Sequence, residues 1–470
     1  MARGGLMGEW TPIEWLALVE HELLLFAAVF FLIGALDEFA VDLAWLWLRL
    51  VGKAETLSID RAEVHARPLS GPAAVLIPTW REAAVIEFTV AHALVAWPQS
   101  NLTLYVGCYA NDPETAEAAL RGAGGDSRVR VVQHDRRGPT TKADCLNRLY
   151  AALEEDERNS GMEFRMIVLH DAEDMVDPAA LALIDGALDE ADFVQLPVLP
   201  EPQRRSRWIG SHYCDEFAED HGKAMLVREA LAAAVPSAGV GCGIARPMLG
   251  KMAATGGIGP FAVESLTEDY ELGLRMKAAG ARPRFLRVRG GDGHLVATRA
   301  CFPARIDDAV RQKARWIHGI AFQGWDRLGW SGGIGERWMR LRDRKGPLTA
   351  LVLLVGYLLL LLGGGMWIAG TIGILRPWRS EPLLDAIIVA NFASLVWRII
   401  MRFAFTTREY GWREGLRAVP RVLVSNVIAI MAARRAAFAY ARTLLGDPPQ
   451  WDKTVHHAHP AATAADRVPA

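Results

Sequence analysis

Short apolar runs alternate with amphipathic stretches through the middle of the chain, between about residues 71 and 330. Five of these runs have the length and composition of buried strands: residues 73–77, 102–108, 129–132, 166–169 and 193–198. Helical patterns cover residues 82–96, 113–122 and 142–155. Strands that alternate with helices predict a mainly parallel sheet, which binds ligands at the carboxyl ends of its strands.

Longer apolar runs flank this region and predict membrane helices. Residues 348–375 contain no charged side chain and are long enough to cross a hydrocarbon core about 30 Å thick. Residues 383–397 predict a second span. Residues 15–36 predict an N-terminal span, followed by an interfacial helix over 39–50. A cleaved signal peptide is the alternative for the first run, but no small-residue cleavage site follows it.

Basic residues indicate how these helices are oriented. The run Arg337, Arg340, Arg342, Arg344 and Lys345 precedes residues 348–375 and predicts that this side faces the cytoplasm. Residues 422–433 are apolar but carry arginines at both ends, so we expect a helix over 415–446 that lies in the membrane interface.

Composition narrows the class of protein further. Hydrophobic residues make up 51% of the 470 residues, which fits a soluble domain joined to a few membrane segments. The net charge of −2 argues against nucleic-acid binding. The five cysteines are scattered and predict reduced thiols in a cytoplasmic domain.

Acidic residues follow the fourth predicted strand. Asp171 and Glu173 alternate in what would be an extended segment, so both side chains can share one direction. Carboxylates suit Mg²⁺ or Mn²⁺, which would neutralise a diphosphate leaving group. An acidic loop that begins the next helix is the structural alternative.

A second acidic segment lies at residues 266–270. Asp269 there has the chemistry of a general base that removes a proton from an attacking hydroxyl. The structural alternative is a capping box formed by Ser265 and Glu268 at the start of a helix that runs to about Ala279.

Two further segments carry candidate ligands for phosphate and sugar. Gln312, Arg315 and Trp316 occupy neighbouring positions of a predicted helix, where Arg315 could bind a diphosphate and Trp316 a sugar ring. Lys142 stands at a helix start that could bind phosphate. The alternatives are a basic helix resting on a membrane and an ordinary helix cap.

In this order and spacing the four segments resemble the processive, cellulose synthase-like branch of family 2 glycosyltransferases. The resemblance runs from about residue 72 to residue 330. It implies an α/β fold of the GT-A type, a Rossmann-like nucleotide-diphospho-sugar transferase domain over residues 71–335 inserted between transmembrane helices. Residues 1–50 would supply one membrane span, and residues 346–400 would supply two. Residues 415–446 would form the interfacial helix.

The resemblance also assigns roles on the donor side. Residues 77–82 look like the family's first-strand motif, which implies that Thr79 and Glu82 lie near the nucleotide base. Asp112 matches the second residue of an Asp-Asp pair whose first place is taken here by Asn111. Lys142 matches the phosphate-binding lysine.

Three matches concern the reaction itself. Asp171-Ala172-Glu173 resembles the metal-binding Asp-x-Asp motif, with Glu in the second place. Residues 267–269 match Thr-Glu-Asp, which implies that Asp269 is the base. Residues 312–316 match Gln-x-x-Arg-Trp, which implies that Gln312, Arg315 and Trp316 hold the acceptor end or the diphosphate. Residues 241–243 resemble a segment that lines the acceptor site.

Within this family, residues 37–42 and 451–456 look most like the phage-adsorption protein B type. Longer members of that type carry a C-terminal regulatory domain, which we expect this sequence to lack. Residues 451–456 are interpreted as a gating segment that closes over the nucleotide, within a C-terminal stretch (447–470) that ends in a disordered tail.

The resemblance implies an inverting, metal-dependent membrane glycosyltransferase that uses a UDP-sugar and Mg²⁺ or Mn²⁺ to build a polysaccharide. We expect a multi-pass protein of the bacterial inner membrane with its catalytic domain in the cytoplasm. Its partners would be a nucleotide-sugar, a growing glycan or lipid acceptor, and an outer-membrane or export protein. The alternatives are transfer of one sugar to a lipid-phosphate carrier and a non-catalytic membrane receptor.

Overall fold

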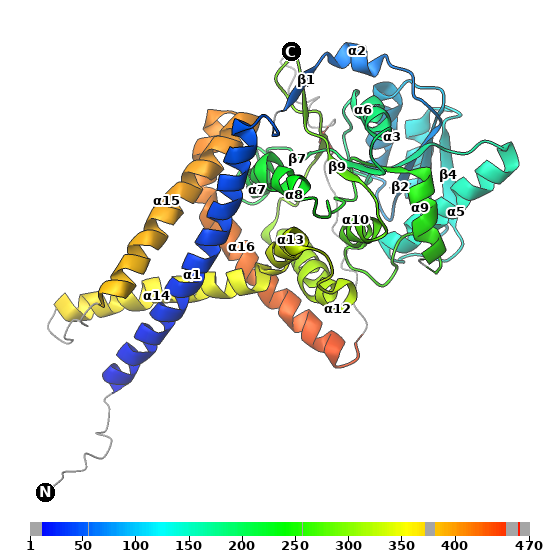
Figure 1. Ribbon diagram of the computed structural model, residues 1–470. Coiled ribbons are helices and arrows are strands. Elements are labelled where there is room, and N and C mark those ends of the chain that lie inside the picture. Colours follow the sequence, from blue (N-terminus) through cyan, green and yellow to red (C-terminus); the bar gives the residue numbers. More distant parts are fainter. Residues whose placement is uncertain (1–11, 55, 256, 372–380, 448–458, 461–470) are drawn as a thin grey trace, which may run out of the picture.

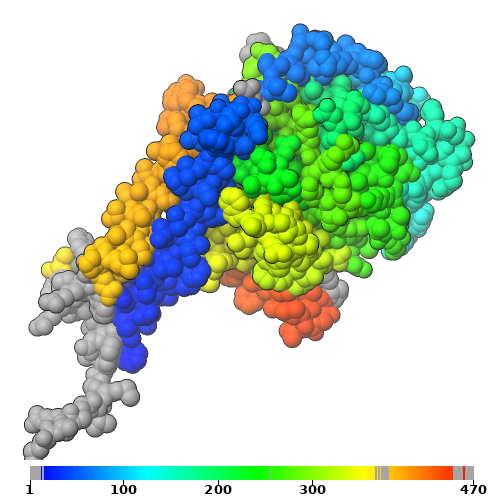
Figure 2. All heavy atoms as spheres, in the orientation of Figure 1, coloured from blue at the N-terminus to red at the C-terminus, as the bar shows by residue number. Residues whose placement is uncertain are grey.

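A three-layer α/β domain joins a set of long helices in the computed structural model, which describes residues 12–54, 56–255, 257–371, 381–447 and 459–460 (Figure 1). The domain forms a rounded body, and helices α1 (Pro12–Leu50) and α15 (Pro382–Tyr410) project from it side by side (Figure 2). The predicted segment 451–456 lies outside the described residues.

The centre of the domain is a seven-stranded sheet with the strand order β4-β3-β2-β5-β8-β6-β9. Its strands are β2 (Ala73–Pro78), β3 (Leu102–Tyr109), β4 (Val129–His134), β5 (Met166–Leu169), β6 (Phe193–Gln195), β8 (Cys242–Ala245) and β9 (Pro283–Phe285). All pairs are parallel except those of β8, which runs antiparallel to both β5 and β6. The mainly parallel sheet predicted from the alternating pattern is thus confirmed.

Helices cover both faces of the sheet, and alternate strand residues divide between two cores. Ala73, Val75 and Ile77 pack with α3 (Ile86–Ala96), α4 (Pro113–Ala123) and α6 (Ala180–Ala187). Ala74 and Leu76 pack with α5 (Lys142–Ser160), α9 (Arg246–Thr255) and α10 (Glu268–Ala278). A strand that is buried on both faces has apolar residues at consecutive positions, which is why these strands could be predicted from the sequence.

The predicted strand over residues 193–198 is wrong in one respect, because it forms parts of two sheets. β6 ends at Gln195, and β7 (Val198–Pro200) pairs instead with β11 (Thr298–Ala300). Pro197 lies between them and has no N–H with which to continue a ladder. A second small sheet pairs β1 (Leu57–Ile59) with β10 (Val288–Gly290).

The remaining helices connect the domain to the long apolar ones. They are α2 (Arg61–His65), α7 (His212–Glu219), the π-helical turn η1 (Asp220–Ala224), α8 (Met225–Ala230), α11 (Ile306–Ile317), the π-helical turn η2 (His318–Gln323), α12 (Gly324–Leu328) and α13 (Ile334–Arg344). The helix predicted from residue 82 begins four residues later, because a turn follows β2.

Four helices in the described part of the chain are long and apolar enough to cross a membrane. They are α1, α14 (Gly346–Thr371), α15 and α16 (Trp412–Leu444). The first differs from the expectation, since the span and the helix over 39–50 form one unbroken helix. α16 is also longer than its apolar centre suggested, and it packs against α11, α14 and α15. Its interfacial position remains a prediction.

Buried and half-buried ion pairs join the apolar helices to the domain. Lys223 of η1 contacts Asp42 of α1, and its Nζ lies 2.8 Å from Glu219 Oε1. Lys345, at the end of α13, lies 2.5 Å from Asp37 Oδ2 and 2.8 Å from Glu38 Oε1. The acidic stretch after the first apolar run therefore fastens α1 to the domain.

Candidate active site

A cavity of about 350 Å³ opens at the carboxyl ends of β2 and β5. Its lining includes all but one of the candidate residues: Thr79, Glu82, Lys142, Asp171, Glu173, Asp269, Gln312, Arg315 and Trp316. Side chains that are far apart in the sequence thus face one space, at the edge where a parallel sheet binds its ligands. Asp112 is the exception.

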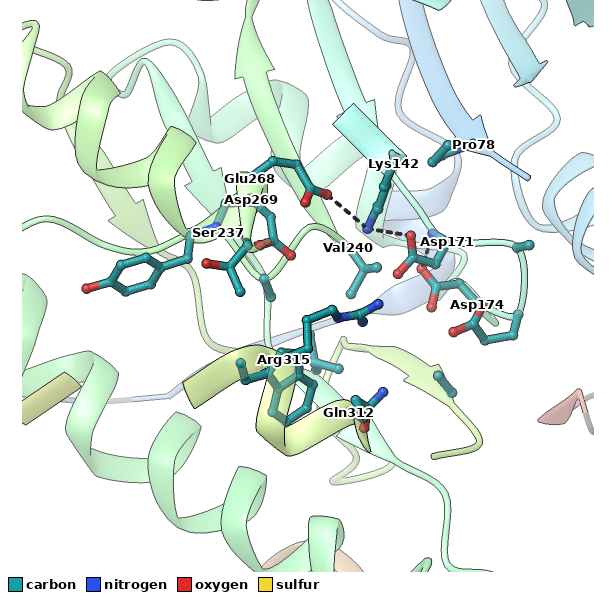
Figure 3. Close-up of a pocket in the computed structure, with 18 of the residues that line it drawn as sticks. Pro78, Lys142, Asp171, Asp174, Ser237, Val240, Glu268, Asp269, Gln312 and Arg315 are labelled. Atoms are coloured by element: carbon teal, nitrogen blue, oxygen red, sulfur yellow. Dashed lines mark hydrogen bonds and ion pairs between the residues drawn. The ribbon is translucent and has the colours of Figure 1, made fainter. Parts of the chain in front are cut away.

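Lys142 provides a positive charge on one wall of the cavity. It begins α5, whose N-cap Thr141 accepts the Asp144 N–H at 3.2 Å, so the predicted helix start is confirmed. Lys142 Nζ lies 2.6 Å from Asp171 Oδ1 and 3.9 Å from Glu268 Oε1 (Figure 3). Burial by itself lowers the pKa of Lys142, but the surrounding carboxylates outweigh it and hold the pKa above its usual value. The ammonium is therefore charged.

The acidic loop after β5 is a turn and not the extended segment expected from the sequence. Asp174 Oδ2 accepts the Asp171 N–H at 2.9 Å and lies 2.8 Å from Nδ1 of the buried His170. This turn still directs both Asp171 and Glu173 to the cavity. Asp174, which the sequence did not single out, therefore positions the other two acids.

Asp269 lies in the first turn of α10, on the far side of Lys142 from the acidic loop (Figure 3). Its Oδ1 accepts the Tyr270 N–H at 2.7 Å. Gly239 makes room for it, since a Cβ there would lie 2.5 Å from Asp269 Oδ2 and the residue has φ +73°.

The loop that contains Gly239 is held by the buried side chain of Gln195. Its amide nitrogen donates to the carbonyl of Val240 at 2.9 Å, and its amide oxygen accepts the Ala238 N–H at 2.9 Å. Sequence reasoning missed this residue, although a glutamine at the end of an apolar strand is a recognisable signal. Residues 241–243 were expected to line the acceptor site, and they lead into β8. Ala238 and Val240, which come just before them, line the cavity.

The capping box of Ser265 and Glu268, the structural alternative for this segment, does not form. Thr267 takes the N-cap position, and Ser265 Oγ accepts its N–H at 3.3 Å. The Thr267 side chain faces η2 instead, where a Cβ on Gly319 would lie 2.4 Å from its Oγ1. Glu268 is consequently released from capping and faces Lys142, and burial raises the pKa of Glu268.

Helix α11 carries the Gln-x-x-Arg-Trp segment on the opposite wall from Lys142. Arg315 extends toward the acids, and within the described residues its guanidinium forms no ion pair (Figure 3). Gln323, at the end of η2 and seven residues after Trp316, accepts the Leu266 N–H at 3.0 Å. This bond joins the Gln-x-x-Arg-Trp segment to the start of α10. It therefore helps to fix the position of Arg315 relative to Asp269.

The remaining wall lies beyond β2. The Thr79 hydroxyl donates to the Gly107 carbonyl at 2.6 Å, and the Glu82 N–H donates to Thr115 Oγ1 at 2.9 Å. Trp80 and Tyr109 meet edge to face with their ring centroids 5.2 Å apart. Aromatic rings beside fixed polar groups suit a nucleotide base.

Asp112 is buried behind this wall and is not among the residues that line the cavity. Its Oδ2 accepts the N–H of Arg81 at 2.5 Å, and Arg81 has the left-handed φ of 54° that is unfavourable for a residue with a side chain. Asn111 binds both backbone groups of Gly138, at 2.7 and 2.8 Å. An aspartate could not donate to that carbonyl, so the asparagine found here is explained.

The acids of the cavity fit a divalent cation that is shared with a substrate. The described residues contain no group of three or more histidine, cysteine, aspartate or glutamate side chains that could hold a metal by itself. Mg²⁺ and Mn²⁺ that act on nucleotides are commonly bound by one or two carboxylates together with phosphate oxygens. Asp171 and Glu173 provide that incomplete set.

Together the doubly covered sheet and the acidic and basic groups at its carboxyl edge define a glycosyltransferase domain of the GT-A type. A family model described as "Glycosyltransferase like family 2" matches residues 71–319, and the protein belongs to that family.

Two curated relatives extend the similarity into the apolar helices. Bacteriophage adsorption protein B of Escherichia coli K12 is 34% identical over 460 residues, which cover 91% of this chain and 61% of that protein. Bacteriophage N4 adsorption protein B of Escherichia coli O157:H7 matches to the same extent. The chain spans about three fifths of the length of these relatives.

Two solved structures are similar to this chain at low sequence identity. The mannosyltransferase PcManGT of Pyrobaculum calidifontis, in complex with GDP-Man and Mn²⁺, has a TM-score of 0.49 at 17% identity, and the match covers 86% of this chain and 99% of that chain. The glucosyl-3-phosphoglycerate synthase of Mycobacterium tuberculosis with Mg²⁺ and UDP has a TM-score of 0.36 at 16% identity, covering 59% and 88%.

Proposed function

We propose that this protein is an inverting, metal-assisted membrane glycosyltransferase that transfers sugar from a UDP-sugar to a growing glycan. One observation carries the proposal: a single cavity is lined by two acids that suit a cation, two cations that suit a diphosphate, and a separate acid placed as a base. A receptor or scaffold would have no need of that set.

The donor would lie across the carboxyl edge of the sheet. The base would rest beside Thr79 and Glu82, and the diphosphate between Lys142 and Arg315, which approach from opposite walls (Figure 3). Arg315 offers the paired donors that bind phosphate oxygens in two places. A Mg²⁺ or Mn²⁺ held by Asp171 and Glu173 would neutralise charge on the leaving diphosphate when bound.

Asp269 would remove the proton from the acceptor hydroxyl as its oxygen attacks the anomeric carbon. The carbon–oxygen bond to the diphosphate breaks as the new bond forms, and the nucleoside diphosphate leaves with the electron pair. A single displacement of this kind inverts the anomeric centre. Trp316 and Gln312 would hold the acceptor end.

The membrane position follows from the long apolar helices and the charges beside them. Arg342 and Lys345 precede α14, and by the positive-inside rule these charges support a cytoplasmic position for the domain, which we propose lies at the inner membrane of a bacterium. The product glycan would leave between the helices toward an export or outer-membrane partner.

A donor screen tests the proposal. Membranes containing the protein are incubated with labelled UDP- and GDP-sugars and Mn²⁺, and both released nucleotide and retained sugar are measured. We expect one UDP-sugar to give label in material that grows with time. Label confined to a single-sugar lipid would support the carrier-lipid alternative, and no turnover with any donor would refute the proposal.

Removal of metal is an independent test. We expect excess EDTA to abolish transfer and added Mn²⁺ or Mg²⁺ to restore it, because two carboxylates alone would repel the diphosphate. Asp171→Asn should raise the Mn²⁺ concentration needed for half-maximal activity. Full activity in EDTA would remove the metal from the mechanism.

A further inference from the structure

The cavity continues past the donor residues to the junction between the domain and the apolar helices. Its lining there comprises Phe217 of α7, Asp220 and His221 of η1, and Phe302. None of these residues belongs to the segments assigned to the donor, the metal or the base. Trp316 stands between the two parts of the cavity and contacts this aromatic group.

Asp220 exposes its carboxylate to this inner part of the cavity. Its side chain is 56% exposed, whereas the side chains of the flanking Glu219 and His221 are only 9% and 8% exposed. Desolvation by the surrounding protein raises the pKa of Asp220 to about 6, although the nearby Arg228 favours the ionised form. At neutral pH the group is an ionised acceptor of hydrogen bonds.

The π-helical turn fixes the direction of that carboxylate. η1 interrupts a continuous helix from His212 to Ala230, and such insertions change which side chains face a given side. Gly222 is pressed against α15, where a Cβ would lie 2.5 Å from the Phe405 ring. The turn therefore cannot rotate without clashing with an apolar helix.

His221 supplies a second polar atom beside this carboxylate. Its Nδ1 accepts the buried Val198 N–H at 3.0 Å and lies 3.2 Å from the Val198 carbonyl oxygen, so the backbone holds the ring on this side. Burial lowers the pKa of His221 to about 4, so the ring stays neutral. Nε2 lies 3.8 Å from Asp220 Oδ2, which puts a ring nitrogen and a carboxylate side by side.

A carboxylate and a neutral imidazole nitrogen next to aromatic rings match the chemistry of a sugar. Adjacent hydroxyl groups on a pyranose ring each donate and accept, while the C–H face of the ring packs on aromatic side chains. The Phe217 ring centroid lies 5.2 Å from that of His221 and 5.2 Å from that of Phe302, so an apolar wall adjoins the polar pair.

We propose that Asp220 and His221 bind hydroxyl groups of the acceptor glycan and so select and position it for transfer. This inference rests on the proposed function, since it concerns the acceptor of that reaction. It assigns acceptor recognition to the junction with the apolar helices, where a product bound for the membrane would pass.

The test separates transfer to the acceptor from transfer to water. Purified protein in detergent is given the labelled donor found in the screen, and label in glycan is measured beside label released as free sugar. We expect Asp220→Asn and His221→Gln to lower incorporation about tenfold or more, the effect of losing one good hydrogen bond to a charged group. Hydrolysis and the KM for donor should stay within about twofold of wild type.

Two further variants complete the experiment. Asp220→Glu keeps the charge and should recover part of the incorporation, while Asp307→Asn, an exposed acid on α11 outside the cavity, should resemble wild type. Equal losses of incorporation and hydrolysis, or unchanged incorporation in Asp220→Asn with an intact melting transition, would overturn the inference. If wild type incorporates no sugar, the proposed function fails and the inference falls with it.

Discussion

Lys142 shows how a single side chain balances the charge of the cavity. Asp171, Glu268 and Asp269 all favour its charged form, and it partly neutralises them in return. Such mutual dependence is typical of sites that bind phosphate, where a fixed cation must persist without a ligand. The sequence indicated Lys142 as a phosphate ligand, but its partnership with Glu268 arises only in the folded chain.

Asp269→Asn tests the base. We expect transfer to fall by about 10² to 10⁴, because the amide cannot take up the proton of the attacking hydroxyl. Binding of UDP, measured by the shift in melting temperature, should persist because Asp269 lies across Lys142 from the acidic loop (Figure 3). Activity within tenfold of wild type would remove Asp269 from this role.

His212 predicts how stability depends on pH. Burial and the nearby Lys313 lower its pKa to about 4, against about 6.5 in an unfolded chain. The unfolded chain therefore takes up a proton that the folded chain does not, so this contribution is complete above pH 6.5 and is lost as the pH falls toward 4.

We accordingly expect the melting temperature to fall on acidification through this range. For this one group the free energy of unfolding decreases by up to about 1.4 kcal/mol per pH unit. His212→Gln should flatten the profile. The exposed His294→Gln is the matched control and should retain the wild-type slope. Identical profiles for all three proteins would contradict the assignment.

At the scale of elements, loops and helix starts set the distances between reacting groups. The loop before β8 is tied to Gln195, and the start of α10 is tied to Gln323 of η2. Both ties join segments that are far apart in sequence and meet only at the edge of the sheet. A displacement of about 1 Å in such a frame can cost about a hundredfold in rate.

Gly239→Ala tests that frame. The new Cβ would lie 2.5 Å from Asp269 Oδ2, and φ +73° is unfavourable for alanine, so Asp269 must move. We expect transfer to fall about tenfold or more. Gly161→Ala, with φ +68° and open space around its Cβ, carries the same backbone strain at the end of α5.

The two variants should therefore lose similar thermal stability, about 1 kcal/mol each, while only Gly239→Ala loses transfer. Transfer rates and melting temperatures measured on the same preparations decide the matter. Equal activity in both would show that the Gly239 loop does not constrain the base.

At the scale of the whole molecule, ion pairs and not apolar contacts alone join the domain to α1 and α15. Lys223 contacts Asp42, and Asp42 Oδ2 also accepts the Trp397 Nε1–H at 2.8 Å. Glu219 lies 2.8 Å from Arg402 of α15. Buried charges are costly when one partner is removed, so this junction depends on complete pairs.

Lys223→Met tests the junction. It leaves the buried Asp42 without its cation, and we expect the free energy of unfolding to fall by about 3–5 kcal/mol, seen as a lower melting temperature in detergent. Adding Asp42→Asn should restore much of the loss. Arg67→Met breaks an exposed pair with Glu63 and should cost less than about 1 kcal/mol. Equal effects of Lys223→Met and Arg67→Met would contradict this account of the junction.

Local pattern accounts for much of the fold. Buried strands such as β2 and β5 form continuous apolar runs, which can be recognised in the sequence. Helix starts such as Thr141 can be recognised too, because the capping side chain binds an N–H group only a few residues away in the chain. Non-local partners decided the positions that the sequence did not predict. Glu268 faces Lys142 and does not cap its helix with Ser265, and Asp112 lies outside the cavity lining and holds Arg81.

The amino-acid sequence by itself determined the alternating strands and helices, the apolar helices and the chemical types of the reacting residues, because each depends on neighbours within a few positions. Only the tertiary structure decided that α1 runs unbroken, that Glu268 faces Lys142, and that Asp220 opens into the cavity. These outcomes depend on contacts between segments more than a hundred residues apart, and no local pattern carries information about which distant surface a side chain will meet.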